Sequence, residues 1–262
     1  MPRRSPRAII EPHKKTDAFC TILRNPTMNA AEIVKELKAL GSESIKKVLL
    51  KHGIQEPLFG VKVEELKKIQ KRIKKDHQLA LDLYDTGIYD AMYLAGLIAD
   101  DLKMTKKNLQ HWVEKATCIA LCGSTVSWVA AESHYGWDLA LEWIESKEEK
   151  VAATGWGTLS SLVGIKDDAD LDLAELKKLL QRVQKTLPKE PNRVRHAMNG
   201  FVIAVGTYVK PLSDLALKTA QKIGQVSVDV GDTACKVPYA PEYIEKALKN
   251  GVVGKKRKTA KC

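Results

Sequence analysis

A helical repeat of apolar side chains runs through almost the whole chain and constrains its fold more than any other feature. Ile33, Leu37 and Leu40 are spaced by four and three residues, which places them on one face of a helix. Similar stripes recur in segments of roughly 10–18 residues, which Gly, Pro or capping residues interrupt. Alternating patterns typical of strands are nearly absent before residue 226. The sequence therefore predicts an all-α protein.

The predicted helices are similar in length and their connections are short. Successive helix pairs recur every ~35–45 residues, the spacing of HEAT and armadillo arrays. We therefore expect a HEAT-like α-solenoid of stacked antiparallel helix pairs with a concave groove. The repeat domain is assigned to residues 28–248, including an extended, turn-rich segment at 224–241. A disordered basic tail over residues 1–27 precedes it, and a basic tail over residues 249–262 follows.

Charge is distributed unevenly along the 262 residues, which carry 43 Lys and Arg against 32 Asp and Glu. Residues 1–27 hold six basic and two acidic side chains, and residues 249–262 hold six basic and no acidic ones. Between these tails, two basic stretches at 35–75 and 173–248 flank an acidic one at 76–172. Basic stretches favour a polyanionic partner, most commonly nucleic acid, although Lys-rich helices are also ordinary solvated faces.

The composition excludes several classes of protein. With 44% hydrophobic and 29% charged residues the chain is an ordinary globular one. No run approaches the roughly 18 apolar residues that cross a bilayer, so no membrane partner is expected. The five cysteines are odd in number and scattered, which suits a reducing cytosol rather than a disulfide framework or a metal site. We expect a cytoplasmic monomer without a cofactor.

Several phrases in the chain resemble a known family. They are residues 56–69, which lead through Leu-Phe-Gly-Val into a basic helix, residues 155–161 and 193–200, and the Gly-Lys-Lys-Arg-Lys tail. In combination, over about residues 28–224, they resemble the DNA alkylation repair family of AlkD-like glycosylases. The resemblance implies a basic groove that cradles double-stranded DNA with alkylated bases. It also implies hydrolytic release of purines such as 3-methyladenine and 7-methylguanine without base flipping.

The chain departs from that family at the catalytic positions. The family uses an Asp, flanked by two Trp, to stabilise positive charge on the sugar. On this chain the Asp position falls on Ser127, one Trp position falls on Gly123, and the other falls near Gly200 or Phe201. Glycosylase activity is therefore left open. The alternative is a non-catalytic module that binds damaged or branched DNA or an acidic protein partner.

Two other carboxylates are candidates for the catalytic role. Glu132 follows Trp128 by four residues, so both lie on one helix face and preserve the order of aromatic and carboxylate. Asp229 lies on the extended segment and reaches the groove if that segment folds back. The competing interpretation of the first pair is a core Trp beside a surface charge.

The candidate DNA contacts combine cations, an amide and aromatic rings. Arg195 and Asn199 share a face near the start of a helix, where backbone N–H groups also favour phosphate; the alternative is pairing of Arg with the acidic stretch. Trp156, between two glycines, either contacts DNA or fills a helix crossing. The predicted contacts are Trp128, Trp156, Arg193, Arg195, Asn199, Lys236, Lys67 and Lys71.

The acidic stretch provides a test of the DNA hypothesis. Acidic side chains inside the groove would repel phosphate, so this stretch must face outward if DNA is to enter. Asp82, Asp100 and Glu142 are its representatives. A structure in which these three line the groove would exclude DNA binding.

Overall fold

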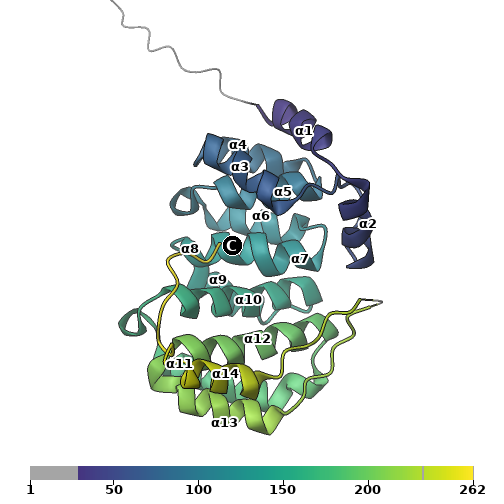
Figure 1. The fold of residues 1–262 in the computed structure, drawn as a ribbon. Coiled ribbons are helices and arrows are strands. Elements are labelled where there is room, and N and C mark those ends of the chain that lie inside the picture. Colours follow the sequence, from purple (N-terminus) through teal and green to yellow (C-terminus); the bar gives the residue numbers. More distant parts are fainter. Residues whose placement is uncertain (1–28, 232, 262) are drawn as a thin grey trace, which may run out of the picture.

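Helices make up the regular structure of residues 29–231 and 233–261, the part of the chain that the computed structural model describes (Figure 1). The predicted tail over residues 1–27 lies outside this part. The α-helices are α1 (Ala30–Ala39), α2 (Glu43–Lys51), α3 (Val63–Ile73), α4 (His77–Asp85), α5 (Tyr89–Ile98), α6 (Lys106–Lys115), α7 (Ile119–Leu121), α8 (Ser127–Glu132), α9 (Gly136–Trp143), α10 (Glu149–Ile165), α11 (Leu173–Thr186), α12 (Asn192–Tyr208), α13 (Ser213–Ile223) and α14 (Ala240–Lys249). Single 3-10 turns occur at η1 (Asp101–Lys103), η3 (Asp168–Asp170), η4 (Leu187–Lys189) and η5 (Lys210–Leu212).

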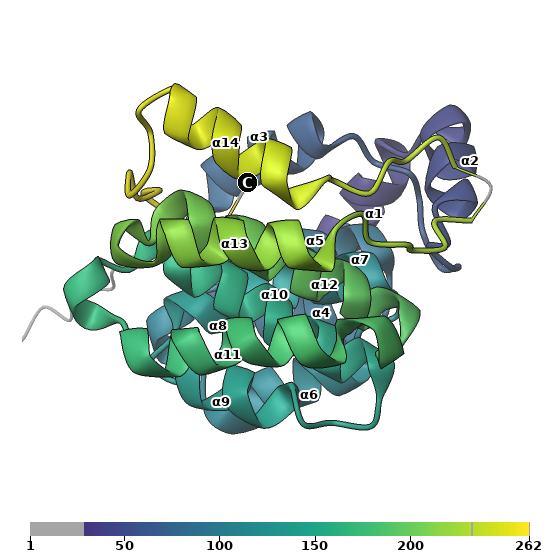
Figure 2. The same cartoon turned by 90° about the horizontal axis from the view of Figure 1, so that it is seen from below.

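The helices stack in layers, which is the arrangement that the apolar stripes predict. Helices α5, α7–α8, α10 and α12 follow one another as an inner layer, and α4, α6, α9 and α11 pack behind them (Figure 2). Trp112 and Trp143 are fully buried in one apolar cluster, and Trp156 and Phe201 in a second. Taken singly, none of the described helices is long and apolar enough to cross a bilayer.

The Leu-Phe-Gly-Val phrase has a structural explanation. Gly60 has a φ of 75°, and a Cβ there would lie 2.5 Å from the backbone nitrogen of Lys46. The buried Asp90 of α5 accepts hydrogen bonds from the backbone N–H groups of Phe59 (2.6 Å) and Val61 (2.8 Å). The close approach of Gly60 to the start of α2 and the hydrogen bonds to the buried Asp90 carboxylate thus fix the backbone that leads into α3.

One predicted helix contains an irregular turn. The periodicity predicts a single helix over residues 118–132, and the helical segment Ile119–Glu132 is continuous, but its middle, η2 (Cys122–Val126), is a π-helical turn between α7 and α8. The buried Ser127 hydroxyl donates to the Cys122 carbonyl five residues earlier (2.7 Å). π-Turns inside helices are frequent at functional sites, and this one faces the concave side.

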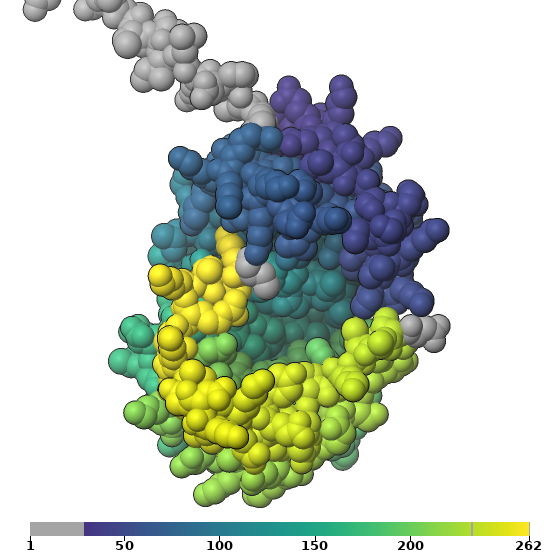
Figure 3. Space-filling model, in the orientation of Figure 1, coloured from purple at the N-terminus to yellow at the C-terminus, as the bar shows by residue number. Residues whose placement is uncertain are grey.

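Two non-helical segments return over the inner layer. The extended segment, predicted over 224–241, is described at residues 224–231 and 233–239, because α14 already begins at Ala240. The C-terminal strap (residues 250–261) runs from α14 back toward the N-terminal half (Figures 1 and 3). The basic tail predicted from residue 249 is therefore packed against the domain from 250 to 261. Its Ala260 is fully buried.

Candidate functional site

The concave face carries a hollow over α8, α10 and α12 (Figure 3). This central hollow has a volume of about 530 Å³. Its floor is made of small side chains at helical spacing, including Ala153 and Gly157 on α10 and Gly200 and Ala204 on α12. Trp128, 7% exposed, borders it and packs edge-on against Tyr93. A floor without large side chains leaves room for another molecule to approach the helix backbones.

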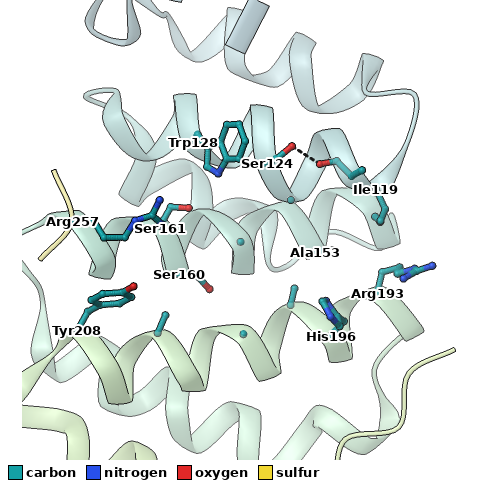
Figure 4. Close-up of a pocket in the computed structure, with 16 residues that line it drawn as sticks. Ile119, Ser124, Trp128, Ala153, Ser160, Ser161, Arg193, His196, Tyr208 and Arg257 are labelled. Atoms are coloured by element: carbon teal, nitrogen blue, oxygen red, sulfur yellow. Dashed lines mark hydrogen bonds between the residues drawn. The ribbon is translucent and has the colours of Figure 1, made fainter. Parts of the chain in front are cut away.

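Cationic groups stand at both ends of this floor. Arg193 and His196 lie at one end, and Arg257 lies beside Tyr208 at the other (Figure 4). Fifteen residues of α12 separate Arg193 from Tyr208, which corresponds to about 22 Å at 1.5 Å per residue. Two separated cationic ends on one floor suit an extended anionic ligand rather than a small ion.

The groups at these ends differ in their contacts. The backbone N–H of Arg193 donates to Glu149 Oε1 (2.6 Å), while its guanidinium has no partner among the described residues. Withdrawal from water, aided by Arg193, lowers the pKa of His196 below its ordinary value. Arg257 is held by a hydrogen bond from its backbone N–H to the Gly164 carbonyl (2.8 Å). Its side chain is exposed, and its Nη2 donates to the Ala260 carbonyl (3.2 Å) and the Lys261 carbonyl (3.5 Å) of the same strap, which leaves the other guanidinium nitrogens for a ligand.

Negative side chains are missing from the lining of the central hollow, as far as the described residues go. Asp82 and Glu142 are exposed on α4 and α9 of the outer layer. Asp100 lies beside Lys75 and Lys103 and does not line the hollow. The arrangement that would exclude DNA binding is therefore not found.

The positions predicted to correspond to the AlkD-like catalytic set hold no Asp or Trp. Ser127, at the Asp position, is fully buried, and a Cβ on Gly157 of α10 would lie 2.7 Å from its hydroxyl. Gly123 and Gly200, at the Trp positions, lie on the floor of the hollow, and a Cβ at either would meet nothing within 4 Å. The residue at the predicted Asp position is thus buried between helices, whereas the two glycines at the predicted Trp positions leave free space on the floor of the hollow.

The two carboxylates predicted as catalytic lie outside the central hollow. Glu132 accepts hydrogen bonds from the Thr259 hydroxyl and from the Ala260 N–H (2.7 Å), so it anchors the C-terminal strap. Asp229 is exposed, and its Oδ1 accepts from the Gly231 N–H (2.8 Å). Neither carboxylate is placed against the floor on which DNA would lie.

Two predicted DNA contacts need correction. Trp156 is fully buried, with its ring 5.2 Å from that of Phe201, and so fills a helix crossing. Asn199 is 1% exposed and donates to the Pro238 carbonyl (2.8 Å). Burial removes both side chains from direct contact with DNA.

Arg195 and Asn199 do share a face, but that face holds the extended segment. The Arg195 guanidinium donates to the Ser227 carbonyl (3.0 Å) and the Glu190 carbonyl (2.9 Å). Its third bond goes to Asn192 Oδ1 (3.3 Å). The predicted phosphate clamp is therefore occupied by the protein's own backbone.

The predicted lysines are dispersed. Lys236 is exposed on the extended segment, Lys67 is half-buried on α3, and Lys71 borders a second hollow. Arg257 was missed as a site residue because nothing local in the sequence indicates that the tail returns to the groove. No group of three or more His, Cys, Asp or Glu among the described residues could hold a metal ion.

Comparison with known proteins supports the architecture. Residues 33–244 match the family model for DNA alkylation repair enzymes. Two Listeria proteins described only as uncharacterized are similar over 218 residues, which cover 81% of this chain and 94% of each relative: Lin0241 of L. innocua (35% identical) and Lmo0209 of L. monocytogenes (36% identical). A solved structure, 35% identical with a TM-score of 0.83, covers 90% of this chain and 100% of its own. It is described as representing a new family of proteins related to the HEAT-like repeat DNA glycosylases, with affinity for branched DNA structures. The predicted HEAT-like all-α fold is thereby confirmed.

Proposed function

The chain belongs to the DNA alkylation repair family, and we propose that it binds branched DNA in the central hollow without releasing bases. The observation that carries this proposal is a floor of small residues with Arg193 at one end and Arg257 at the other, and with no carboxylate among its described lining residues. The affinity of its structural relative for branched DNA supports the choice of ligand.

Phosphate is the group that these ends are suited to hold. Guanidinium groups bind phosphate oxygens through paired charge-assisted hydrogen bonds. At the start of α12 the backbone N–H of Arg193 is taken by Glu149, so the guanidinium of Arg193 is the group that would meet the phosphate. The ~22 Å between the ends corresponds to about six steps of a DNA strand at 3.4 Å per step. Gly123 and Gly200 let the sugar–phosphate backbone approach the floor closely.

Base release needs a different arrangement. Cleavage of the glycosidic bond develops positive charge on the sugar, which a carboxylate must face to stabilise it. Glu132 is engaged by the strap and Asp229 lies in an exposed turn, so neither meets this requirement. We therefore expect binding of distorted DNA, including DNA with alkylated bases, but not excision.

The binding experiment compares a three-way junction with a linear duplex of equal length by fluorescence anisotropy. Replacing Arg193 and Arg257 by Gln removes two phosphate contacts, each worth about 5-fold at 0.15 M salt, so junction affinity should fall ~30-fold. The slope of log affinity against log salt should flatten by about 1.8. A control with the same charge loss, Lys177→Gln with Lys185→Gln, alters exposed lysines of α11 in the outer layer. Equal binding by the Arg variant and the control would refute the proposed site.

The base-release experiment uses alkylated duplex DNA and measures free methylated purine. The natural protein is expected to release none above the uncatalysed background. Release that disappears in Glu132→Gln would instead identify a glycosylase that uses this carboxylate. Release that persists in Glu132→Gln would direct attention to Asp229.

A further inference from the structure

The C-terminal strap crosses the ends of successive inner helices. Its backbone is held by hydrogen bonds from Gly254 N–H to the Thr207 carbonyl (2.9 Å) and from Arg257 N–H to the Gly164 carbonyl (2.8 Å). At its far end, the Lys261 ammonium lies 2.8 Å from Asp101 Oδ1. The strap is thus attached to α12, to α10 and to the turn after α5.

A second hollow lies on the other side of this strap. It has a volume of about 490 Å³ and is lined by the end of α3 together with Glu132, Thr259 and Lys261. Arg257 lines the central hollow, while Thr259 and Lys261 line the second one. The strap therefore contributes residues to both hollows.

The second hollow, called here the lysine hollow, carries four lysines: Lys71, Lys74, Lys75 and Lys261. Its two lining carboxylates are already engaged: Asp101 by Lys75 and Lys261, and Glu132 by the strap. Lys71 and Lys74 are exposed, and their ammonium groups have no hydrogen bond or ion pair within the described part of the chain. Two free ammonium groups at the rim of a cavity favour an anionic ligand.

Lys74 adds an independent observation. It follows α3 with a φ of 66°, the only positive φ among the described residues other than glycine. Glycine adopts this conformation without a steric cost, whereas a lysine is strained there. The strained residue is thus a lysine, and its exposed ammonium group lies at the rim of this hollow.

We propose that the lysine hollow binds backbone phosphate of a second arm of branched DNA while the first arm occupies the central hollow. This inference rests on the proposed function and extends it. A junction presents two phosphate tracks that diverge from one point, and the strap separates two cationic hollows on one face. A linear duplex that occupies the central hollow has no second arm to offer.

The test compares junction and duplex binding for Lys71→Gln combined with Lys74→Gln. Loss of two phosphate contacts should weaken junction binding about 30-fold at 0.15 M salt and flatten its salt slope by about 1.8. Binding of the linear duplex should change less than about 2-fold, because no phosphate reaches this hollow. Lys177→Gln with Lys185→Gln serves again as the control of equal charge.

One substitution distinguishes an effect of the Lys74 charge on DNA binding from an effect on the stability of the fold. Lys74→Gly should raise the melting temperature, because strain is relieved, yet weaken junction binding by about 5-fold. Equal losses for junction and duplex in the double variant would overturn the second-arm site but leave the central hollow intact. Unchanged junction binding would overturn it as well. If the natural protein binds neither DNA, the proposed function and this inference both fail.

Discussion

Replacing Gly200 by Ala should stabilise the protein although the glycine lies on the proposed binding floor. Gly200 is in the interior of α12, and a Cβ there would meet nothing within 4 Å. Glycine in a helix interior is less favourable than alanine by about 0.8–1.0 kcal/mol. Because the methyl group meets no steric opposition, the free energy of unfolding should rise by about that amount. For a chain of this size the melting temperature should increase by about 2–4 °C.

The same position should separate stability from binding. Leucine has a helix propensity similar to that of alanine, so Gly200→Leu should retain the fold. Its side chain should occupy the central hollow and weaken DNA binding at least 10-fold, which corresponds to about 1.4 kcal/mol. Stability is measured by urea and thermal unfolding, and binding by anisotropy with a three-way junction. Gly206→Ala on the same helix is the matched control, because its Cβ would lie 2.6 Å from Ile244 Cδ1 and should destabilise. The reasoning is refuted if Gly200→Ala destabilises the protein or if Gly200→Leu binds DNA like the natural protein.

Three further predictions concern single side chains. Glu132→Gln should leave base release at the uncatalysed background, as in the natural protein, but loosen the strap, which faster hydrogen exchange of the Ala260 N–H would report. A bound phosphate should raise the depressed pKa of His196, so DNA affinity should increase as pH falls toward and below the ordinary histidine pKa of about 6.5, and His196→Gln should abolish this trend in anisotropy titrations. Burial raises the pKa of Asp101 against the opposing effect of Lys261. Lys261→Met should therefore cost about 3 kcal/mol, or less if the strap detaches. Without Lys261 the pKa of Asp101 in the folded protein rises further. The cost of the substitution is therefore present above that pKa, where the buried carboxylate is charged, and should shrink as pH falls through it and the carboxylate takes up a proton. Unfolding measured at several pH values would show this trend.

Local patterns were sufficient to predict the helices but not what each helix faces. Ile33 and Leu37 are both fully buried, because an apolar stripe has one way to leave water. The periodicity did not predict the π-helical turn within residues 118–132. There the Ser127 hydroxyl bonds to a backbone carbonyl and competes with the regular hydrogen bonds of the helix.

Long-range contacts decided the roles of the predicted polar residues. The spacing of Arg195 and Asn199 correctly places them on one face, but the partner opposite them is a segment more than 30 residues later in the chain. Arg257 reaches the central hollow only because its backbone bonds to Gly164. Neither pairing leaves a periodic signal in the sequence, so the candidate site could be predicted only in part.

The fold does not require an AlkD-like catalytic set, because the packing of the helices and such a set depend on different faces of the same helices. Ser127 faces α10, where its hydroxyl donates to the Cys122 and Thr154 carbonyls. A carboxylate in that place would be buried against two carbonyl oxygens with nothing to donate to it, which is costly. Gly123 and Gly200, in contrast, touch nothing on the floor, so the helices do not depend on larger side chains there. The solenoid can therefore keep its groove and its cationic ends without an AlkD-like catalytic set at these positions.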